Sequence, residues 1–367
     1  MMLFGFTEAQ ITILVEKLPT NTSPETRLYL ASSLNNWNPK DVSFELKKNA
    51  ENQFQIQINA DKGFDFKITQ GSWDSSEANK DGSPIDNHKV NINTVSPLKI
   101  NIENWTTPQE KQHSTTSNVK ILSENFKIPQ LKATRRIWVY LPPNYDSTTK
   151  KYPVIYMHDG QNLFDNATSF SGEWGVDETM NQLSENHQFD AIIVGIDNGG
   201  DARLDEYSPW RNTKYQKGGE GNQYIDFITQ TLKPYIDKRY RTLTQPKNTA
   251  LIGSSMGGLI SLYGGVKYPQ VFGKIGIFSP AFWFVSKDLN YFINQNRNNL
   301  HQSKFYFVAG QNEDDGMPKE IENIKTLLLQ KKVPTQNISV KIDPDGTHSE
   351  SYWRREFGNA VLWLLRR

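Results

Sequence analysis

The chain has 367 residues and nearly balanced charge, with 41 Lys and Arg against 40 Asp and Glu. Nucleic-acid-binding proteins usually carry a basic excess, so this balance argues against nucleic acid as a partner. The absence of cysteine excludes disulfides, a thiol nucleophile and Cys-ligated metal sites, and no apolar run is long enough to span a membrane.

The first ten residues have an unusual pattern. Residues 1–6 (MMLFGF) are apolar, and a small residue, Ala9, follows shortly before the first strand-like run. An apolar run before a small residue is typical of the end of a secretory signal peptide. We expect residues 1–10 to be a signal remnant and the protein to be secreted or periplasmic. The alternative is an ordinary leading segment, which leaves a cytoplasmic location open.

Residues 11–105 predict a small all-β sandwich domain. Short runs with alternating apolar and polar residues are separated by clusters of Asn, Asp, Gly, Ser and Pro, which is the pattern of antiparallel strands and turns. The predicted strands are 11–18, 27–34, 54–60, 64–71, 90–95 and 98–105. Residues 106–119 are polar without periodicity, and they predict a linker.

From residue 120 to 367 the pattern changes to strands that alternate with helices. Near-continuous apolar strands separated by helices predict an α/β fold with a mostly parallel sheet covered on both faces, a three-layer sandwich. The predicted strands are 137–142, 153–160, 191–198, 249–255, 274–280, 304–310 and 339–345, and the predicted helices are 175–186, 220–237, 256–267, 317–331 and 350–366. In such sheets the functional loops follow the carboxyl ends of the strands.

A candidate nucleophile lies between a predicted strand and a predicted helix. Residues 253–257 read Gly-Ser-Ser-Met-Gly, which fits the pattern G-x-S-x-G with Ser255 at its centre. At such a turn the serine hydroxyl points away from the sheet, and the flanking glycines avoid collisions with the neighbouring strand and helix. Ser254 is the second choice, because it lacks the glycine two residues before it.

A serine nucleophile needs a general base, usually histidine, and an acid that orients it. Of the six histidines, His348 alone follows the last predicted strand and precedes the final helix, which fits the chain order Ser, acid, His. The acid is expected after the strand 304–310. There Glu313 is favoured, then Asp314, then Asp315.

The remaining site residues are expected on loops near Ser255. The N–H of Met256, the residue after the nucleophile, and the N–H of Gly160 or Gln161 are the candidate donors of an oxyanion hole. His158, which ends a strand, fits a role in shaping that loop better than the role of base. The side chains expected to line the substrate pocket are Trp174, Arg203, Glu206, Trp210, Trp283 and Trp353. The tryptophans and Phe282 offer flat faces for a sugar or a feruloyl ring, although core packing explains some of them, and Arg203 and Glu206 could instead pair with each other.

Several stretches together resemble an esterase branch of the α/β-hydrolases. These are residues 136–145 (RIWVYLPPNY), 157–164 (MHDGQNLF), 174–177 (WGVD), 203–210 (LDEYSPW after Arg203), 253–258 (GSSMGG), 278–283 (FSPAFW), and His348 with Trp353. The branch includes enterochelin esterases, esterase D and feruloyl or acetyl xylan esterases. The resemblance covers residues 120–367. It implies that Ser255, Glu313 and His348 form a catalytic triad, with Glu313 the least secure because the acid varies within the family.

Residues 11–104 resemble the starch-binding type of carbohydrate-binding module. The resemblance rests on residues 28–39 (LYLASSLNNWNP) and 63–73 (GFDFKITQGSW). Such modules stack sugar rings on exposed tryptophans. Trp37 matches one such position and Trp73 lies near the second in a shifted context. The alternative is that both tryptophans pack within the sandwich or against the catalytic domain.

The sequence therefore predicts a serine carboxylic ester hydrolase that needs neither metal nor cofactor. Its partner is an ester substrate, expected to be polysaccharide-linked, such as acetyl or feruloyl xylan. One alternative is an esterase for an enterochelin-type siderophore. Another, of a different class, is a catalytically inactive carbohydrate-binding protein.

Overall fold

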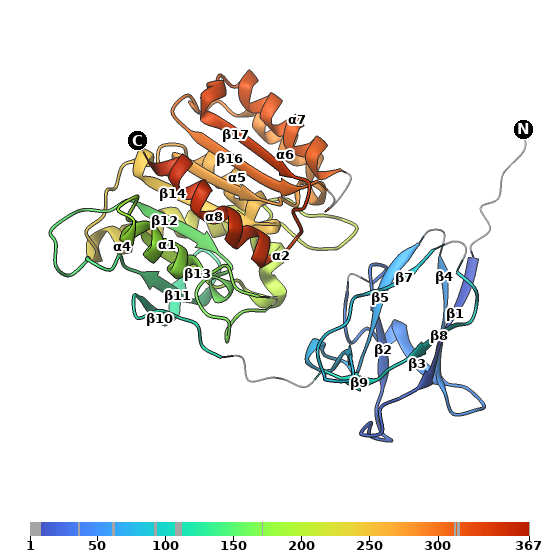
Figure 1. Cartoon of the computed structure of the whole chain (residues 1–367). Helices are drawn as coiled ribbons and strands as arrows, with labels where there is room; N and C mark the ends of the chain where they lie inside the picture. The colour runs from blue at the N-terminus through green and yellow to red at the C-terminus, as the bar shows by residue number, and fades with distance from the viewer. Residues whose placement is uncertain are drawn as a thin grey trace, which may run out of the picture. The chain divides into compact units, whose positions relative to one another are not determined.

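The computed structural model describes residues 9–35, 37–60, 63–91, 94–106, 112–170, 172–311, 313 and 316–366. Residues 1–8, the greater part of the expected signal remnant, lie outside them. The chain divides into two compact units, Met1–Glu110 and Lys111–Arg367 (Figure 1). None of the helices in the described ranges combines the length and the apolar character that crossing a membrane requires.

The first unit is all-β, as predicted. Its strands are β1 (Ala9–Lys17), β2 (Leu28–Ser32), β3 (Glu45–Lys48), β4 (Phe54–Ala60), β5 (Phe64–Thr69), β6 (Glu77–Ala78), β7 (His88–Val90), β8 (Leu98–Asn101) and β9 (Asn104–Trp105). Seven of them follow the order β7-β5-β2-β3-β4-β1-β8, and β6 pairs with β9. Strand β3 joins two halves, because Glu45 and Leu46 pair with β2 whereas Lys47 and Lys48 pair with β4. A strand that changes sheets in this way forms a corner of a sandwich.

The second unit contains one sheet of eight strands. They are β10 (Val119–Ile128), β11 (Ala133–Tyr140), β12 (Val154–His158), β13 (Ile192–Ile196), β14 (Thr249–Ser254), β15 (Lys274–Phe278), β16 (Lys304–Gly310) and β17 (Ile338–Asp343). Their order is β10-β11-β13-β12-β14-β15-β16-β17. All pairs from β13 to β17 are parallel, and β10 and β11 add an antiparallel edge. The predicted mostly parallel sheet is confirmed.

Helices cover both faces of this sheet. They are α1 (Val176–Glu185), α2 (Arg203–Glu206), α3 (Gly221–Phe227), α4 (Lys233–Arg239), α5 (Met256–Lys267), α6 (Ser286–Gln295), α7 (Met317–Gln330) and α8 (Glu350–Leu365). Neighbouring strand residues point to opposite faces: Val154 and Tyr156 join a core with α3, α5, α6 and α7, whereas Ile155 and Met157 join one with α1 and α8. In Figure 1, α1 in green and α8 in red lie side by side.

Several elements differ from the expectation. The segment predicted as one helix over 220–237 consists of α3 and α4 joined by a π-helical turn, Ile228–Leu232. Strand β10 occupies residues at the end of the predicted linker and beyond it. Residues 112–118 of that linker also bond to the second unit, since the Thr116 N–H donates to Asp177 Oδ2 at 2.8 Å. These residues are polar because they donate to buried acids instead of joining an apolar core, and polarity without periodicity is also the pattern of a linker.

Candidate active site

The functional loops gather at one edge of the sheet because six parallel strands end there. Residues 159–162 follow β12, residues 197–203 follow β13, and Ser255 follows β14. Ser279 follows β15, Glu313 follows β16, and His348 follows β17. This is the edge at which parallel α/β sheets carry their ligand sites.

Ser255 lies in a strained turn between β14 and α5. Its backbone angles are φ 56° and ψ −121°, a conformation that L-residues rarely adopt. A side chain at Gly253 would come within 2.7 Å of Cδ2 of His158 and 2.8 Å of the Gly257 backbone. The glycine at 253 is therefore needed, as predicted. A Cβ at Gly257 would meet nothing closer than 3.5 Å, so the position tolerates a first carbon, and the expected collision of larger side chains there stays a prediction.

His348 and Glu313 form a hydrogen-bonded pair. His348 Nδ1 lies 2.8 Å from Glu313 Oε2, and the Glu313 side chain is fully buried. The other oxygen, Oε1, accepts hydrogen bonds from the Ser279 hydroxyl at 2.8 Å and from the Gly310 N–H at 2.5 Å. Ser279 in turn accepts a bond from Trp353 Nε1 at 2.9 Å. A carboxylate that accepts here makes Nδ1 the donor and leaves Nε2 as the basic nitrogen of the ring.

The loops that carry this pair touch through their backbones. Gly310 ends β16, and a side chain there would collide with the carbonyl oxygen of Gly346, three residues after β17. A side chain at Gly346 would lie 2.6 Å from the Cα of Gly310. The positions of Glu313 and His348 relative to each other are therefore set by direct backbone packing.

Sequence reasoning missed Ser279, which holds the acid in place. Its φ of 40° is again in the left-handed region, and the signal that could have found it is a small polar residue directly after a buried strand of the parallel sheet. The competing acids Asp314 and Asp315 lie outside the described residues. Glu313 therefore remains the predicted acid, and its hydrogen bond to His348 is the geometric argument for it.

Ser255 and His348 line one cavity of about 510 Å³. Trp174, Trp353 and Arg203 also line it, so three of the six expected pocket residues face this space. The two indole rings lie 5.5 Å apart at 36°. The Trp353 ring also meets the His348 ring edge-on at 5.2 Å.

Two N–H groups are available for an oxyanion. Met256 is the first residue of α5, where backbone N–H groups have no partner within the helix. Residues 160–162 form a 3₁₀ turn, and Gln161 lines the cavity whereas Gly160 does not. Among the described residues no acceptor is recorded for the N–H of Met256 or of Gln161. Of the two expected loop donors, Gln161 therefore has the better position.

This turn is held in place by an ion pair beneath it. Asp159 adopts a left-handed conformation (φ 56°, ψ 49°) and its carboxylate binds Arg203 through two bonds of 2.7 and 2.8 Å. Asn198 donates to the same carboxylate at 2.7 Å, and the Tyr207 hydroxyl accepts from the Asp159 N–H at 3.1 Å. Burial alone would raise the pKa of Asp159, but the Arg203 guanidinium outweighs it and keeps the pKa below its usual range.

His158 is buried behind the nucleophile turn. Its Nδ1 lies 2.8 Å from the Tyr224 hydroxyl, and it does not line the cavity. Burial lowers the pKa of His158 to about 3, so the ring is neutral near neutral pH. Its place under the turn agrees with a shaping role and not with that of a base.

The other expected pocket residues lie elsewhere. Arg203 does not pair with Glu206, because it binds Asp159, and Glu206 pairs with Arg135 instead. Glu206 is buried, and neither it nor Trp210 or Trp283 lines the cavity. Trp210 packs into a cluster of aromatic rings and Trp283 is 46% exposed. The expected broad aromatic cleft is therefore reduced to two tryptophans, since sequence position shows which strand end a residue follows but not which way its side chain points.

The charges that face the cavity are mainly negative. The acidic residues that line it are Asp159, Asp201 and Glu350, and the basic residues are Arg203 and His348. Because Arg203 is bound to Asp159, these two charges offset each other, and Asp201 adds a further negative charge at the cavity wall. An anionic ligand would meet repulsion here.

The two tryptophans of the first unit lie together. The rings of Trp37 and Trp73 are 6.3 Å apart at 41°, and both side chains are half-buried. Trp37 has a φ of 58°. The pair therefore presents part of two aromatic rings at the surface of this unit.

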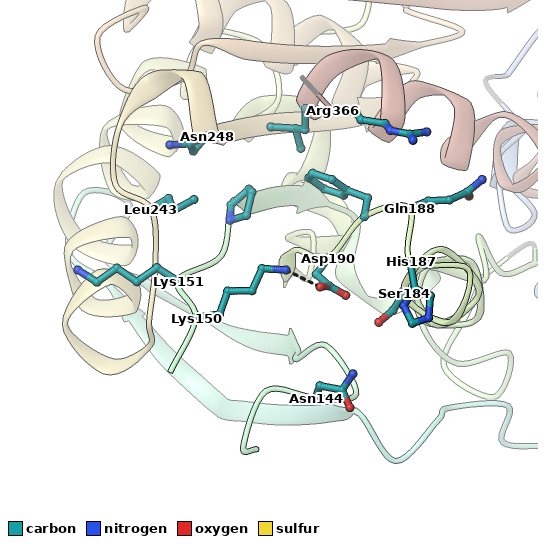
Figure 2. Close-up of a pocket in the computed structure, with 13 residues that line it drawn as sticks. Asn144, Lys150, Lys151, Ser184, His187, Gln188, Asp190, Leu243, Asn248 and Arg366 are labelled. Atoms are coloured by element: carbon teal, nitrogen blue, oxygen red, sulfur yellow. Dashed lines mark hydrogen bonds and ion pairs between the residues drawn. The ribbon is translucent and has the colours of Figure 1, made fainter. Parts of the chain in front are cut away.

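A second cavity, of about 490 Å³, opens at the opposite edge of the sheet (Figure 2). Pro153, Asp190 and Asn248, which line it, precede β12, β13 and β14. Figure 2 shows Lys150 reaching Asp190, whose carboxylate it meets at 2.7 Å. None of the predicted catalytic residues lines this cavity.

Comparison with known proteins gave a family match and several relatives. The family model described as "Putative esterase" matches residues 128–364. The uncharacterized protein YbbA of Bacillus subtilis is 28% identical over 244 residues, 63% of this chain and 92% of that protein. An endo-1,4-beta-xylanase/feruloyl esterase of Xylanibacter ruminicola is 26% identical over 147 residues, 38% of this chain and 19% of that protein. The enterobactin esterase FES of Shigella flexneri shares the fold, with a TM-score of 0.57 and 16% identity over 97% of this chain and 92% of that chain.

Proposed function

The chain belongs to the putative esterase family and is a carboxylic ester hydrolase, and we propose that it acts through a triad of Ser255, His348 and Glu313. The observation that carries this proposal is the geometry at the strand ends. A strained serine and a histidine line one cavity, and a buried carboxylate binds the far nitrogen of that histidine.

In the proposed reaction His348 Nε2 takes the proton of Ser255 as the serine oxygen attacks the ester carbonyl. The Met256 and Gln161 N–H groups hold the tetrahedral oxyanion. Glu313 accepts a hydrogen bond from the Nδ1–H of His348, which fixes the ring and stabilises its charged form. The carbon–oxygen bond to the alcohol then breaks, and the alcohol leaves with the proton from Nε2. Water, deprotonated by the same nitrogen, hydrolyses the acyl-enzyme.

The test is turnover of p-nitrophenyl acetate by the full chain and by Ser255→Ala. We expect the substitution to lower kcat by at least about 10⁴-fold, because the nucleophile is lost. Ser254→Ala is the matched control and should keep most of the activity. Activity that survives in Ser255→Ala, or that disappears only in Ser254→Ala, contradicts the assignment.

For the substrate we propose an uncharged ester on a carbohydrate, such as an acetyl or feruloyl group on xylan. The partial relative in Xylanibacter ruminicola is described as a xylanase and feruloyl esterase. Trp174 and Trp353 offer flat apolar faces beside Ser255, which suit a sugar or a feruloyl ring. Asp201 disfavours an anionic substrate at the same cavity.

A siderophore triester is the second candidate, favoured by the fold likeness to an enterobactin esterase over nearly the whole chain. A ferric tricatecholate carries several negative charges, which the acidic side chains of the cavity would repel. Product release from feruloylated or acetylated xylan, measured beside release from an iron-loaded catecholate triester, separates the two candidates. Faster turnover of the triester would exclude the carbohydrate proposal.

The expected alternative of another class, an inactive sugar-binding protein in which the first unit carries the function, disagrees with the family match. The exposed parts of Trp37 and Trp73 give it some support. Its signature would be no labelling of Ser255 by a fluorophosphonate together with retained polysaccharide binding. We expect stoichiometric labelling of Ser255 instead.

A further inference from the structure

Three carboxylates converge beside the candidate active site without lining its cavity. Each of Glu173, Asp177 and Glu178 offers an oxygen, and these three oxygens lie within 4.8 Å of one another. Glu173 directly precedes Trp174 of the catalytic cavity, and the other two acids lie in the first turn of α1. Proximity alone would not make this a site, since acidic clusters are common on protein surfaces.

The second observation is that one oxygen of each carboxylate is buried without a hydrogen-bond partner. These are Glu173 Oε1, Asp177 Oδ1 and Glu178 Oε2. Asp177 is completely buried and Glu173 is only 9% exposed. A buried carboxylate oxygen without a partner is costly, and three of them in one cluster indicate a missing positive group.

The protein contacts the other oxygen of each carboxylate. The Ser114 hydroxyl donates to Glu173 Oε2 at 2.8 Å, and the Thr116 N–H donates to Asp177 Oδ2 at 2.8 Å. For Glu178 the neighbour is Arg354, whose Nη2 lies 3.6 Å from Oε1. Carboxylates that are oriented by protein donors on one oxygen and keep another oxygen without a partner are typical of a metal site with its supporting shell.

We propose that Glu173, Asp177 and Glu178 bind a divalent cation of the calcium class. Carboxylate oxygens select hard cations. Oxygens up to 4.8 Å apart still fit one Ca²⁺, since its bonds of about 2.3–2.6 Å allow opposite ligands to be about 4.6–5.2 Å apart. Glu178, whose side chain is 34% exposed, leaves an open side for entry and for coordinating water.

The charge of the cluster also favours a bound cation, because the carboxylates outnumber the positive groups around them. Among the described side chains that contact these three acids, Arg354 is the one cation, and its nearest nitrogen is 3.6 Å from Glu178, beyond hydrogen-bond distance. One guanidinium does not balance three carboxylates. A divalent ion would do so, and it would tie residues 114–116, which reach Glu173 and Asp177, to the start of α1 and to Trp174.

The experiment uses the full chain, stripped of metals with a chelator and then titrated with Tb³⁺ and Ca²⁺. Trp174 lies next to Glu173 and should sensitise Tb³⁺ luminescence on tryptophan excitation. We expect a saturable signal that Ca²⁺ displaces. Ca²⁺ at a hundredfold excess over its Kd should raise the Tm by roughly 5 °C.

The variants Asp177→Asn and Glu178→Gln should each weaken Ca²⁺ and Tb³⁺ binding at least tenfold. Glu322→Gln, an exposed glutamate on α7, is the matched control and should bind normally. If Asp177→Asn does not fold, the Glu178→Gln variant tests the proposal by itself, because Glu178 is partly exposed.

Two results would overturn the proposal. No sensitised signal and no change of Tm with millimolar Ca²⁺ would mean that protons shared among the carboxyl groups hold the cluster together. A signal that is unchanged in both variants would mean that the ion binds elsewhere.

Discussion

At the scale of single residues, the acid of the proposed triad determines how His348 is oriented. Glu313 accepts hydrogen bonds from Ser279, Gly310 and His348 while its side chain is fully buried. A carboxylate with three donors and no solvent is fixed in orientation. The histidine that it holds is therefore fixed in one tautomer as well.

We expect Glu313→Gln to lower kcat by about 10³–10⁴-fold with little change in KM, because the amide favours the wrong tautomer of His348. Steady-state kinetics on p-nitrophenyl acetate measures the effect. Asp314→Asn and Asp315→Asn serve as controls and should stay within a few-fold of the unchanged protein. A large loss of kcat in either control, with kcat unchanged in Glu313→Gln, would show that the residue changed in that control is the acid of the triad.

A second residue-scale prediction concerns acid stability. The buried His158 has a pKa of about 3 in the folded chain, against an ordinary value of about 6.5 in the unfolded one. Between these values the unfolded chain binds a proton that the folded chain does not. Above about pH 6.5 His158 should therefore not affect the free energy of unfolding. Below that pH the free energy of unfolding should fall by up to about 1.4 kcal/mol per pH unit.

Urea unfolding at several pH values between about 4 and 7 checks this slope. His158→Gln removes the proton-binding group and should flatten the dependence, whatever its effect on stability at neutral pH. His301→Gln, at an exposed histidine, should leave the slope unchanged. An unchanged slope in His158→Gln would show that other groups cause the acid sensitivity.

At the scale of elements, the short helix α2 supports the turn that follows β12. Its first residue, Arg203, binds Asp159, and Asp159 adopts a left-handed backbone just before Gln161. A bidentate guanidinium–carboxylate pair fixes orientation in a way that a lysine does not reproduce. The proposed oxyanion donor therefore depends on a contact between two loops.

We expect Arg203→Lys to lower kcat about 10–100-fold while KM changes little, since a displaced donor weakens the transition state more than substrate binding. Arg211→Lys, at a neighbouring exposed arginine, is the matched control. Equal loss in kcat and gain in KM would indicate a direct role of Arg203 in binding substrate instead.

Sequence reasoning was strongest where elements follow simple periodicity. The parallel strands and the turn at Ser255 were predictable because apolar runs and G-x-S-x-G have local causes. The sequence did not predict three other features: the π-helical turn, strand β10, and the partners of Arg203 and Glu206. They depend on contacts between residues far apart in the chain, and a polar residue carries no local signal for its partner.

At the scale of the whole molecule, the chain combines an α/β unit with a separate all-β unit. The six strand ends that form the candidate site all belong to the second unit. The Trp37 and Trp73 pair belongs to the first. Turnover of a small ester and attachment to a polymer should therefore be separable properties.

We expect Trp37→Ala and Trp73→Ala to leave kcat/KM for p-nitrophenyl acetate unchanged and to weaken retention on insoluble xylan or starch about tenfold. Each removed ring contributes on the order of 1 kcal/mol or more of stacking to a sugar. Pull-down binding isotherms measure retention, and Trp283→Ala, an exposed tryptophan of the other unit, is the control. Unchanged retention in both variants would exclude sugar binding by this pair.

The backbone contact between Gly310 and Gly346 has a consequence for protein engineering. Neither loop can be exchanged, lengthened or given a bulkier residue at that point without pushing the other away. A graft that aims to alter selectivity around the cavity should therefore carry both segments as one cassette. The loops after β12 and β13 are coupled in the same way through the Asp159–Arg203 pair, so they too should be exchanged together.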